Sequence, residues 1–243
     1  MKRYFLQLSY DGSKFFGWQK QPEQISVQET IELCLSRLHS NQMIKITGCG
    51  RTDTGVHAND YFAHVDLAVA DIDMLVFKLN KMLPDSIVIK SIFEVYPQKH
   101  ARFDAQERIY RYFIHTEKDP FLADRSLLLA QTLDFDLINQ AAKKLIGKKD
   151  FTSFSKLHTD VKTNVCDVRS AELFQTSATT FYFEISADRF LRNMVRAIVG
   201  TLIDVGMGKL NPSDIDRILN DMNRQSASKS AAAHGLFLWE VKY

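Results

Sequence analysis

Stretches with the two-residue repeat of a strand and stretches with helical spacing alternate along this chain, and their order is what most constrains the fold. Residues 3–9 have the aromatic and apolar content of a strand. The apolar residues of 27–38 follow the spacing of one helix face, and Ser26 with Glu29 forms a capping box at its start. Further strands are predicted at 43–49, 61–67 and 87–96, and a further helix at 73–82.

A similar order follows in the second half of the chain. Strands are predicted at 108–116, 165–175, 180–187 and 236–241, and helices at 134–146 and 190–205. Two units of this kind predict an α+β protein with antiparallel sheet and helices on one face, divided near residue 105. No sequence repeat relates the two halves, so the duplication rests on the order of the elements alone.

Composition excludes several classes of protein. Hydrophobic residues make up 45% and charged residues 25% of the 243 residues, which is the balance of an ordinary globular protein. No apolar run reaches the roughly 18 residues of a membrane span, and residues 1–12 lack the apolar stretch of a signal peptide. We therefore expect a cytoplasmic protein. The three cysteines are far apart and the histidines have no partner at ligand spacing, so neither a disulfide framework nor a metal site is predicted.

Basic residues are clustered, although the net charge is only +2 from 31 basic and 29 acidic residues. The clustered arginines are Arg102, Arg108 and Arg111 in one stretch, and Arg189, Arg192 and Arg196 in another. Phosphate binding depends on local clustering rather than on total charge, so these arginines are candidates for phosphate contacts.

The segment GCGRTDTGVHA, residues 48–58, combines three glycines with one arginine and one aspartate after a predicted strand. One interpretation is a phosphate-binding loop, but the lysine-serine ending is absent and Asp53 would repel phosphate. A second interpretation is a plain glycine-rich turn, which spacing alone favours. The third is a catalytic loop that presents Asp53 to a substrate while its backbone passes close to a nucleotide.

The same segment closely resembles the signature of the tRNA pseudouridine synthase A family. Further matches follow the family's order over nearly the whole chain: residues 10–19 (YDGSKFFGWQ), 26–28 (SVQ), 83–84 (LP), 100–105 (HARFDA), 110–114 (YRYFI), 150–154 (DFTSF), 190–200 (FLRNMVRAIVG) and 234–238 (HGLFL). Cys49 and Thr54 stand where the family often has alanine, and both replacements are small. One such motif would be weak, whereas eight in order are specific.

The resemblance implies an isomerase that converts uridine to pseudouridine in the anticodon stem-loop of tRNA (family positions 38–40), acting as a homodimer. It implies two ferredoxin-like (RRM-like) subdomains, residues 1–105 with the catalytic loop and residues 106–243. Their mostly antiparallel sheets are expected to form one continuous sheet with a central active-site cleft.

The resemblance also makes Asp53 the catalytic residue. Pseudouridine formation breaks the bond from uracil N1 to the ribose, turns the base and joins C5 to the same carbon. No atoms enter or leave and no electrons are lost, so no metal or other cofactor is expected. A single carboxylate can serve as nucleophile or as base. The sequence leaves open which of these Asp53 does.

Four further residues are assigned to the substrate site by the resemblance. Arg196 is expected to pair with the catalytic aspartate and keep it ionised in a closed pocket. Tyr110 is expected to stack on the uracil, and Leu236 to line the same pocket. Arg51 is expected to fill the space that a target uridine leaves when it turns out of its stem.

The helical interpretation of residues 190–205 supports the basic cluster. At about 100° per residue, Arg189, Arg192 and Arg196 would lie within roughly a 60° arc. A solvated basic face on an amphipathic helix is the simpler explanation of such an arc.

Two alternatives to the enzyme remain open on the sequence. A catalytically inert RNA-binding module could use the same fold with aromatic strands, but an aspartate beside its RNA surface would weaken phosphate binding. A nucleotide-binding enzyme with a glycine-rich loop would instead bind ATP or GTP.

Overall fold

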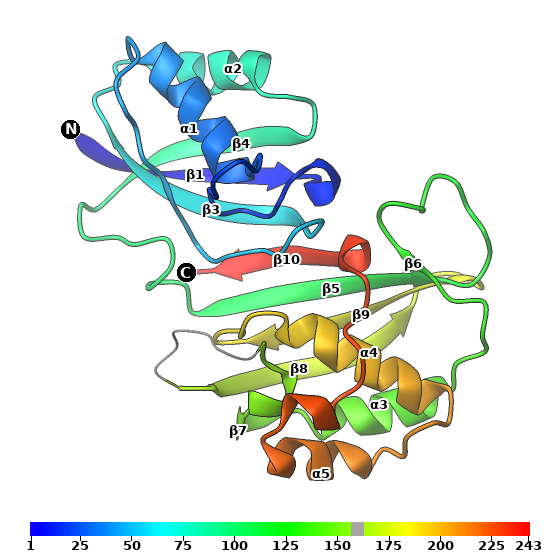
Figure 1. The fold of residues 1–243 in the computed structure, drawn as a ribbon. Helices are drawn as coiled ribbons and strands as arrows, with labels where there is room; N and C mark the ends of the chain where they lie inside the picture. Colours follow the sequence, from blue (N-terminus) through cyan, green and yellow to red (C-terminus); the bar gives the residue numbers. More distant parts are fainter. Residues whose placement is uncertain (157–162) are drawn as a thin grey trace. The chain divides into compact units, whose positions relative to one another are not determined.

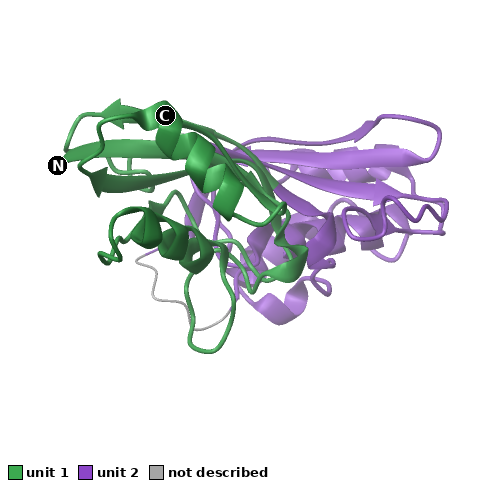
Figure 2. Ribbon diagram, turned by 90° about the horizontal axis from the view of Figure 1, so that it is seen from above, with its two compact units in different colours: residues 1–106, 238–243 green, residues 107–237 purple. Residues whose placement is uncertain are grey.

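The computed structural model describes residues 1–156 and 163–243 (Figure 1). The chain divides into two compact units: unit 1 is Met1–Gln106 with Leu238–Tyr243, and unit 2 is Glu107–Phe237 (Figure 2). Each unit combines helices with mostly antiparallel strands, which confirms the predicted α+β class. The assignment of independent subdomains to 1–105 and 106–243 stays a prediction.

Unit 1 has the element order and strand order of a ferredoxin-like fold. Its elements are β1 (Lys2–Tyr10), α1 (Val27–Leu38), β2 (Thr47–Gly48), β3 (His57–Leu67), α2 (Ile72–Met82) and β4 (Ile87–Val95). The strands are ordered β4-β1-β3-β2, and all neighbours are antiparallel. Helices α1 and α2 lie on one face of this sheet (Figure 1). This order places the chain between β2 and β3, which carries Asp53, beside the end of β1.

Local sequence explains where the helices of unit 1 begin. The side chain of Ser26 accepts a hydrogen bond from the backbone N–H of Glu29, and Asp71 does the same for the N–H of Met74. These caps satisfy amide groups that the first turn of a helix leaves without partners. The predicted helix 27–38 and its serine cap are confirmed.

Unit 2 repeats the pattern with additions. Its elements are β5 (Glu107–His115), β6 (Leu127–Leu128), α3 (Phe135–Lys143), β7 (Gly147–Asp150), β8 (Val165–Gln175), β9 (Thr180–Ala187), α4 (Met194–Gly206) and α5 (Asp214–Asp221). The strands are ordered β5-β9-β8-β7 with antiparallel neighbours, and β6 runs parallel to β5. Helix α3 packs against both α4 and β8. The last strand, β10 (Leu236–Lys242), starts in unit 2 and ends in unit 1.

Short 3-10 helices complete the fold at Gly12–Lys14, Thr152–Phe154, Arg224–Ser226 and Ala233–Gly235. The predicted hairpin of 165–175 and 180–187 is confirmed with the same bounds. Helix α4 is the most apolar helix by sequence but has only 13 residues. Neither it nor any other helix in the two described ranges has the length and apolar content to cross a membrane.

Two predictions about elements are wrong, and one helix was missed. The strand predicted at 43–49 is reduced to Thr47–Gly48, because Ile46 bonds through both its N–H and its carbonyl to side chains of α1. The helix predicted at 190–205 begins only at Met194, because Asn193 has a left-handed backbone with φ of 65°. Helix α5 was not expected at all.

The late start of α4 changes the interpretation of the basic cluster. Arg189 and Arg192 precede the helix, and only Arg196 lies on it. The 60° arc predicted for the three arginines on one helix is therefore wrong.

Candidate functional site

Asp53 lies in the connection from β2 to β3, and its side chain is half-buried. Its carbonyl accepts a hydrogen bond from the N–H of Val56 at 3.1 Å, which makes a tight turn. Gly55 completes this turn with φ of 76°, a conformation that glycine adopts at no steric cost. Of the three glycines in the segment, Gly55 therefore serves the turn that presents the aspartate.

The backbone of residues 12–18 is packed directly against the Asp53 turn. A Cβ built on Gly12 would lie 2.0 Å from the carbonyl oxygen of Val56, and one built on Gly17 would lie 2.4 Å from that of Thr52. The N–H of Trp18 donates to the carbonyl of Thr52 at 3.3 Å. No side chain fits between these two stretches of main chain, so the contact requires glycine at both positions.

Side chains from the same region fix the turn on its other sides. The hydroxyls of Tyr10 and Thr52 form a buried hydrogen bond of 2.9 Å. The rings of Trp18 and Tyr61 are stacked with centroids 4.1 Å apart, and the Tyr61 hydroxyl donates to the carbonyl of Gly50. The sequence identified residues 10–19 as a match to the family but assigned them no role. Its role in the structure is to hold the loop of Asp53.

Side chains of the Asp53 loop alternate in exposure. Arg51 is exposed, Thr52 is buried and Asp53 is half-buried. An exposed guanidinium two residues from the candidate carboxylate is placed to contact a ligand that approaches this loop.

Tyr110 lies on β5 in unit 2 and is half-buried. Its ring meets the ring of Phe190 edge to face, with centroids 5.1 Å apart. Tyr112 on the same strand is fully buried, and its hydroxyl donates to the carbonyl of Ala232 at 2.9 Å. Burial raises the pKa of the Tyr112 phenol. Of the two tyrosines only Tyr110 keeps part of its ring accessible, and Phe190 is a contact that sequence reasoning missed.

Arg196 lies in the first turn of α4 and is tied to the segment before β10. Its Nε donates to the carbonyl of Ala231 at 2.8 Å, and the N–H of Ala231 donates to the carbonyl of Arg196 at 2.9 Å. A Cβ on Gly200 would lie 1.9 Å from the carbonyl oxygen of Lys229, so the helix and this segment approach backbone to backbone. Leu236, which follows the segment, is buried at 5% exposure.

The other predicted phosphate contacts of unit 2 differ in what holds them. Arg111 pairs with Glu184 at 2.7 Å, and its guanidinium lies 4.5 Å from the ring centroid of Tyr182. Arg108 donates to the carbonyl of Asp188 at 2.9 Å. Arg192 is exposed and Arg189 half-buried. The pair with Glu184 makes Arg111 poorly suited to bind phosphate, since a carboxylate already neutralises its charge.

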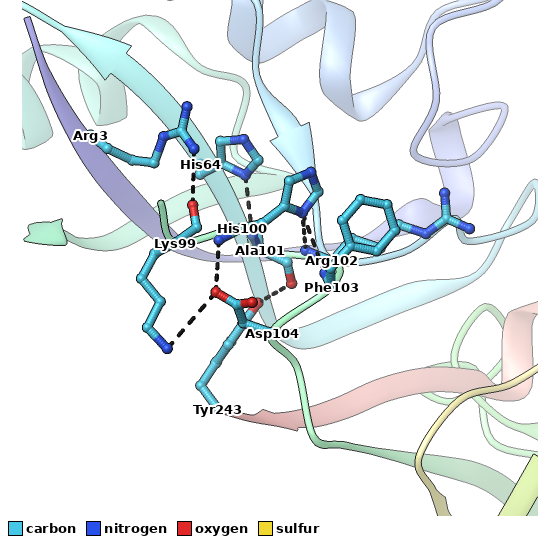
Figure 3. A network of polar contacts seen from close by, with 9 residues as sticks. All are labelled: Arg3, His64, Lys99, His100, Ala101, Arg102, Phe103, Asp104 and Tyr243. Carbon is cyan, nitrogen blue, oxygen red and sulfur yellow. Dashed lines mark hydrogen bonds and ion pairs between the residues drawn. The ribbon is translucent and has the colours of Figure 1, made fainter. Parts of the chain in front are cut away.

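Arg102 belongs to the connection from β4 to β5, where a polar network fixes the backbone (Figure 3). The N–H of Ala101 donates to Nδ1 of His64 at 3.1 Å, and the Tyr243 hydroxyl donates to the carbonyl of Ala101 at 2.6 Å. Arg3 donates to the carbonyl of Lys99 at 3.1 Å. Arg102 itself is exposed.

His64 is the titratable centre of this network. Burial, with smaller contributions from His100 and Arg3, lowers its pKa from 6.5 to about 4. The neutral imidazole is also what the structure requires, because Nδ1 accepts the hydrogen bond from Ala101.

The predicted site residues are divided between the units. Unit 1 holds Arg51, Asp53 and Arg102, and unit 2 holds Tyr110, Arg108, Arg111, Arg189, Arg192, Arg196 and Leu236. Within the described residues, no three His, Cys, Asp or Glu side chains gather as a metal ion would require. The metal-free reaction itself stays a prediction.

Comparison with known proteins gives the class of protein to which this fold and loop belong. Residues 8–104 and 141–243 match the family model for tRNA pseudouridine synthase, which is well over half of the chain. The chain belongs to this family, as the sequence motifs predicted.

Relatives over the full length carry one particular name. The chain is 47% identical to tRNA pseudouridine synthase A of Bacteroides fragilis, over 100% of this chain and 97% of that protein. It is 47% identical to the protein of that name from Porphyromonas gingivalis, with 100% and 98% covered, and 42% identical to that of Brevibacillus brevis, with 100% of both covered. Among solved structures, a Cbf5-Nop10-Gar1 complex aligns with 13% identity and a TM-score of 0.35 over 82% of this chain and 54% of that chain.

We predict that Gly17→Ala destabilises the protein, because φ at this position is 83° and the new Cβ would overlap the carbonyl of Thr52. A strained left-handed residue alone costs about 1–3 kcal/mol. We expect urea unfolding to show a loss of about 2 kcal/mol or more. Gly50→Ala is the matched control, since a Cβ there meets nothing within 4 Å. Equal unfolding free energies for the two variants would contradict the backbone contact.

We predict that His64 makes the free energy of unfolding depend on pH. Between pH about 4 and 6.5 the unfolded chain binds a proton at this imidazole and the folded protein does not. The contribution of His64 to the free energy of unfolding therefore has its full value above pH 6.5 and falls as the pH is lowered from 6.5 to about 4. His64→Gln, measured by urea unfolding at several pH values, should flatten this dependence. His39→Gln is the control, and an unchanged slope in the His64 variant would be evidence against the assignment.

Proposed function

We propose that this protein isomerises uridine to pseudouridine in the anticodon stem-loop of tRNA, at the family's positions 38–40. The observation that carries the proposal is the position of Asp53 on a turn whose two ends, Thr52 and Val56, both contact the main chain of residues 12–17. The chain that carries this turn is a member of the tRNA pseudouridine synthase family. A turn fixed in this way suits an aspartate that must meet one atom of a substrate.

The chemistry needs one carboxylate and a pocket that keeps water out. A glycoside hydrolase needs a second carboxylate to activate water, whereas an isomerase rejoins the same two fragments. We infer that Asp53 acts on the target nucleoside as nucleophile or as base, without metal or other cofactor.

The substrate must leave the base stack before its glycosidic bond can be reached. We propose that Arg51 fills the vacated space and that Tyr110 stacks on the extruded uracil, with Leu236 lining the same pocket. Arg196 would pair with Asp53 and keep it ionised.

Further contacts complete the proposal. Arg102, Arg108, Arg189 and Arg192 would contact RNA phosphates, and Arg111 would do so only if it exchanges Glu184 for a phosphate. We expect the protein to form a homodimer. We also expect it in the cytoplasm, where tRNA is available to the enzyme. An inert RNA-binding module is the competing function, and it predicts RNA binding without turnover.

We predict that the wild-type protein releases tritium from bulk unmodified tRNA labelled at uracil C5. Asp53→Asn should lower this release on the order of 10³-fold or more, because the reacting carboxylate is lost. Both proteins should fold and bind tRNA alike.

The control for the charge change is Asp85→Asn, since Asp85 is an exposed aspartate in the turn before β4. The assay is run with EDTA present, and a loss of activity that zinc restores would contradict the metal-free mechanism. If folded wild-type protein binds tRNA but releases no tritium, the inert binding module replaces the enzyme.

We predict that Tyr110→Phe lowers turnover about fivefold, because the ring still stacks but a phenol hydrogen bond worth about 1 kcal/mol is lost. Tyr110→Ala should lose much more, since stacking is lost as well. Tyr182→Phe on β9 is the matched control, because its ring packs against Phe113 and Phe174 rather than in the proposed pocket. Tritium release at saturating tRNA measures all three, and unaltered turnover in Tyr110→Phe would show that the hydroxyl is dispensable.

A further inference from the structure

An aromatic ring stands exposed on the connection from β4 to β5. Phe103 is 74% exposed, although full burial of such a ring is worth about 1.5–3 kcal/mol. Its ring is stacked on the imidazole of His100, with centroids 4.2 Å apart and planes 30° apart (Figure 3). The guanidinium carbon of Arg102 lies 5.7 Å from the Phe103 ring centroid. The exposed surface therefore combines an aromatic ring with a positive charge.

The backbone beneath this ring is fixed rather than loose. Nδ1 of His100 accepts hydrogen bonds from the N–H groups of Arg102 and Phe103, at 3.1 and 3.3 Å. The N–H of His100 donates to the carboxylate of Asp104 at 2.9 Å. The His100 ring in turn meets buried His64 edge to face, with centroids 4.6 Å apart. A ring held in place in this way loses little conformational entropy when it binds a ligand.

We propose that Phe103, with Arg102 beside it, stacks one unpaired nucleobase of the tRNA substrate, in addition to the base that reacts. This inference rests on the proposed function, which makes the ligand an RNA. Stacking on an aromatic ring accepts any base, and the adjacent guanidinium suits the phosphate that each nucleotide carries. His100 acts as a positioning residue that supports the ring from below.

The cation that the proposal uses is Arg102, whose guanidinium lies beside the ring. Lys99 and Arg3 flank the same turn, but Lys99 is paired with Asp104 and Arg3 with Asp66, so neither is counted as a phosphate contact. Asp104, the nearest acid in the network, faces the backbone of His100 and the ammonium of Lys99. A protein partner, including a second copy of this chain, is the alternative occupant and is an outcome of the test below.

The test compares Phe103→Ala with Phe103→Trp and Phe103→Leu in the full chain, with bulk unmodified tRNA as the probe. We expect Phe103→Ala to weaken tRNA binding and raise KM about tenfold, with kcat unchanged at saturating tRNA. Tryptophan should restore binding, and its fluorescence should be quenched when tRNA binds. Leucine keeps an apolar side chain but no ring face, and should not restore binding.

The matched control is Phe121→Ala, since Phe121 is another exposed phenylalanine, at 87% exposure, in the loop after β5. The salt dependence of tRNA affinity distinguishes the contribution of the Arg102 charge from that of the Phe103 ring. Arg102→Gln should reduce the slope of log Kd against log salt by about one, because one phosphate contact is lost. Phe103→Ala should leave that slope unchanged.

Two results would overturn the inference. The first is tRNA affinity in Phe103→Ala equal to that of Phe121→Ala. The second is a change of Phe103→Ala from dimer to monomer in sedimentation, which would assign the ring to a protein contact. If the wild type releases no tritium, the proposed reaction fails, and the binding measurements still decide the stacking site.

Discussion

The contact of main chain against main chain between residues 12–17 and residues 52–56 is the constraint on which the rest of the candidate site depends. Gly12 and Gly17 allow carbonyls of Val56 and Thr52 to lie where a side chain would otherwise stand. Such a contact has no flexible side chain that could yield, so the position of the Asp53 turn follows the position of β1. Strand β1 is itself anchored by Leu6 and Leu8, which are fully buried. The sheet of unit 1 thereby fixes the direction in which the carboxylate is presented.

In unit 2, a close contact between two stretches of main chain likewise positions Arg196. Gly200 lets helix α4 approach the backbone at Lys229, and Arg196 and Ala231 exchange hydrogen bonds beside that contact. The guanidinium is thus oriented by a carbonyl on the segment that leads into β10. Asn193 sets where this arrangement begins, because its left-handed backbone starts the helix at Met194. If the helix began at residue 190, as predicted, Arg196 would lie in its second turn instead of its first.

Under the proposed function, binding and chemistry draw on different kinds of residue in this protein. The Asp53 turn is hydrogen-bonded through Thr52 to the buried residues Tyr10 and Trp18. Phe103 and Arg51 are exposed and make no contribution to the core. Exposed rings and guanidinium groups suit a large, polyanionic ligand, which must be bound over a wide surface and released after the reaction.

The sequence by itself determined the α+β class, the helix at 27–38 with its serine cap, the hairpin of β8 and β9, and the family, because periodicity, capping and ordered motifs are local properties. It also singled out Asp53, since the motif around it is specific. Only the tertiary structure decided that Ile46 bonds to α1 instead of extending a strand, that Tyr112 is core, and that Arg111 is neutralised by Glu184. These outcomes depend on partners distant in the chain, and no local pattern reports them. The same holds for Gly17, whose need for glycine comes from a carbonyl 35 residues further along.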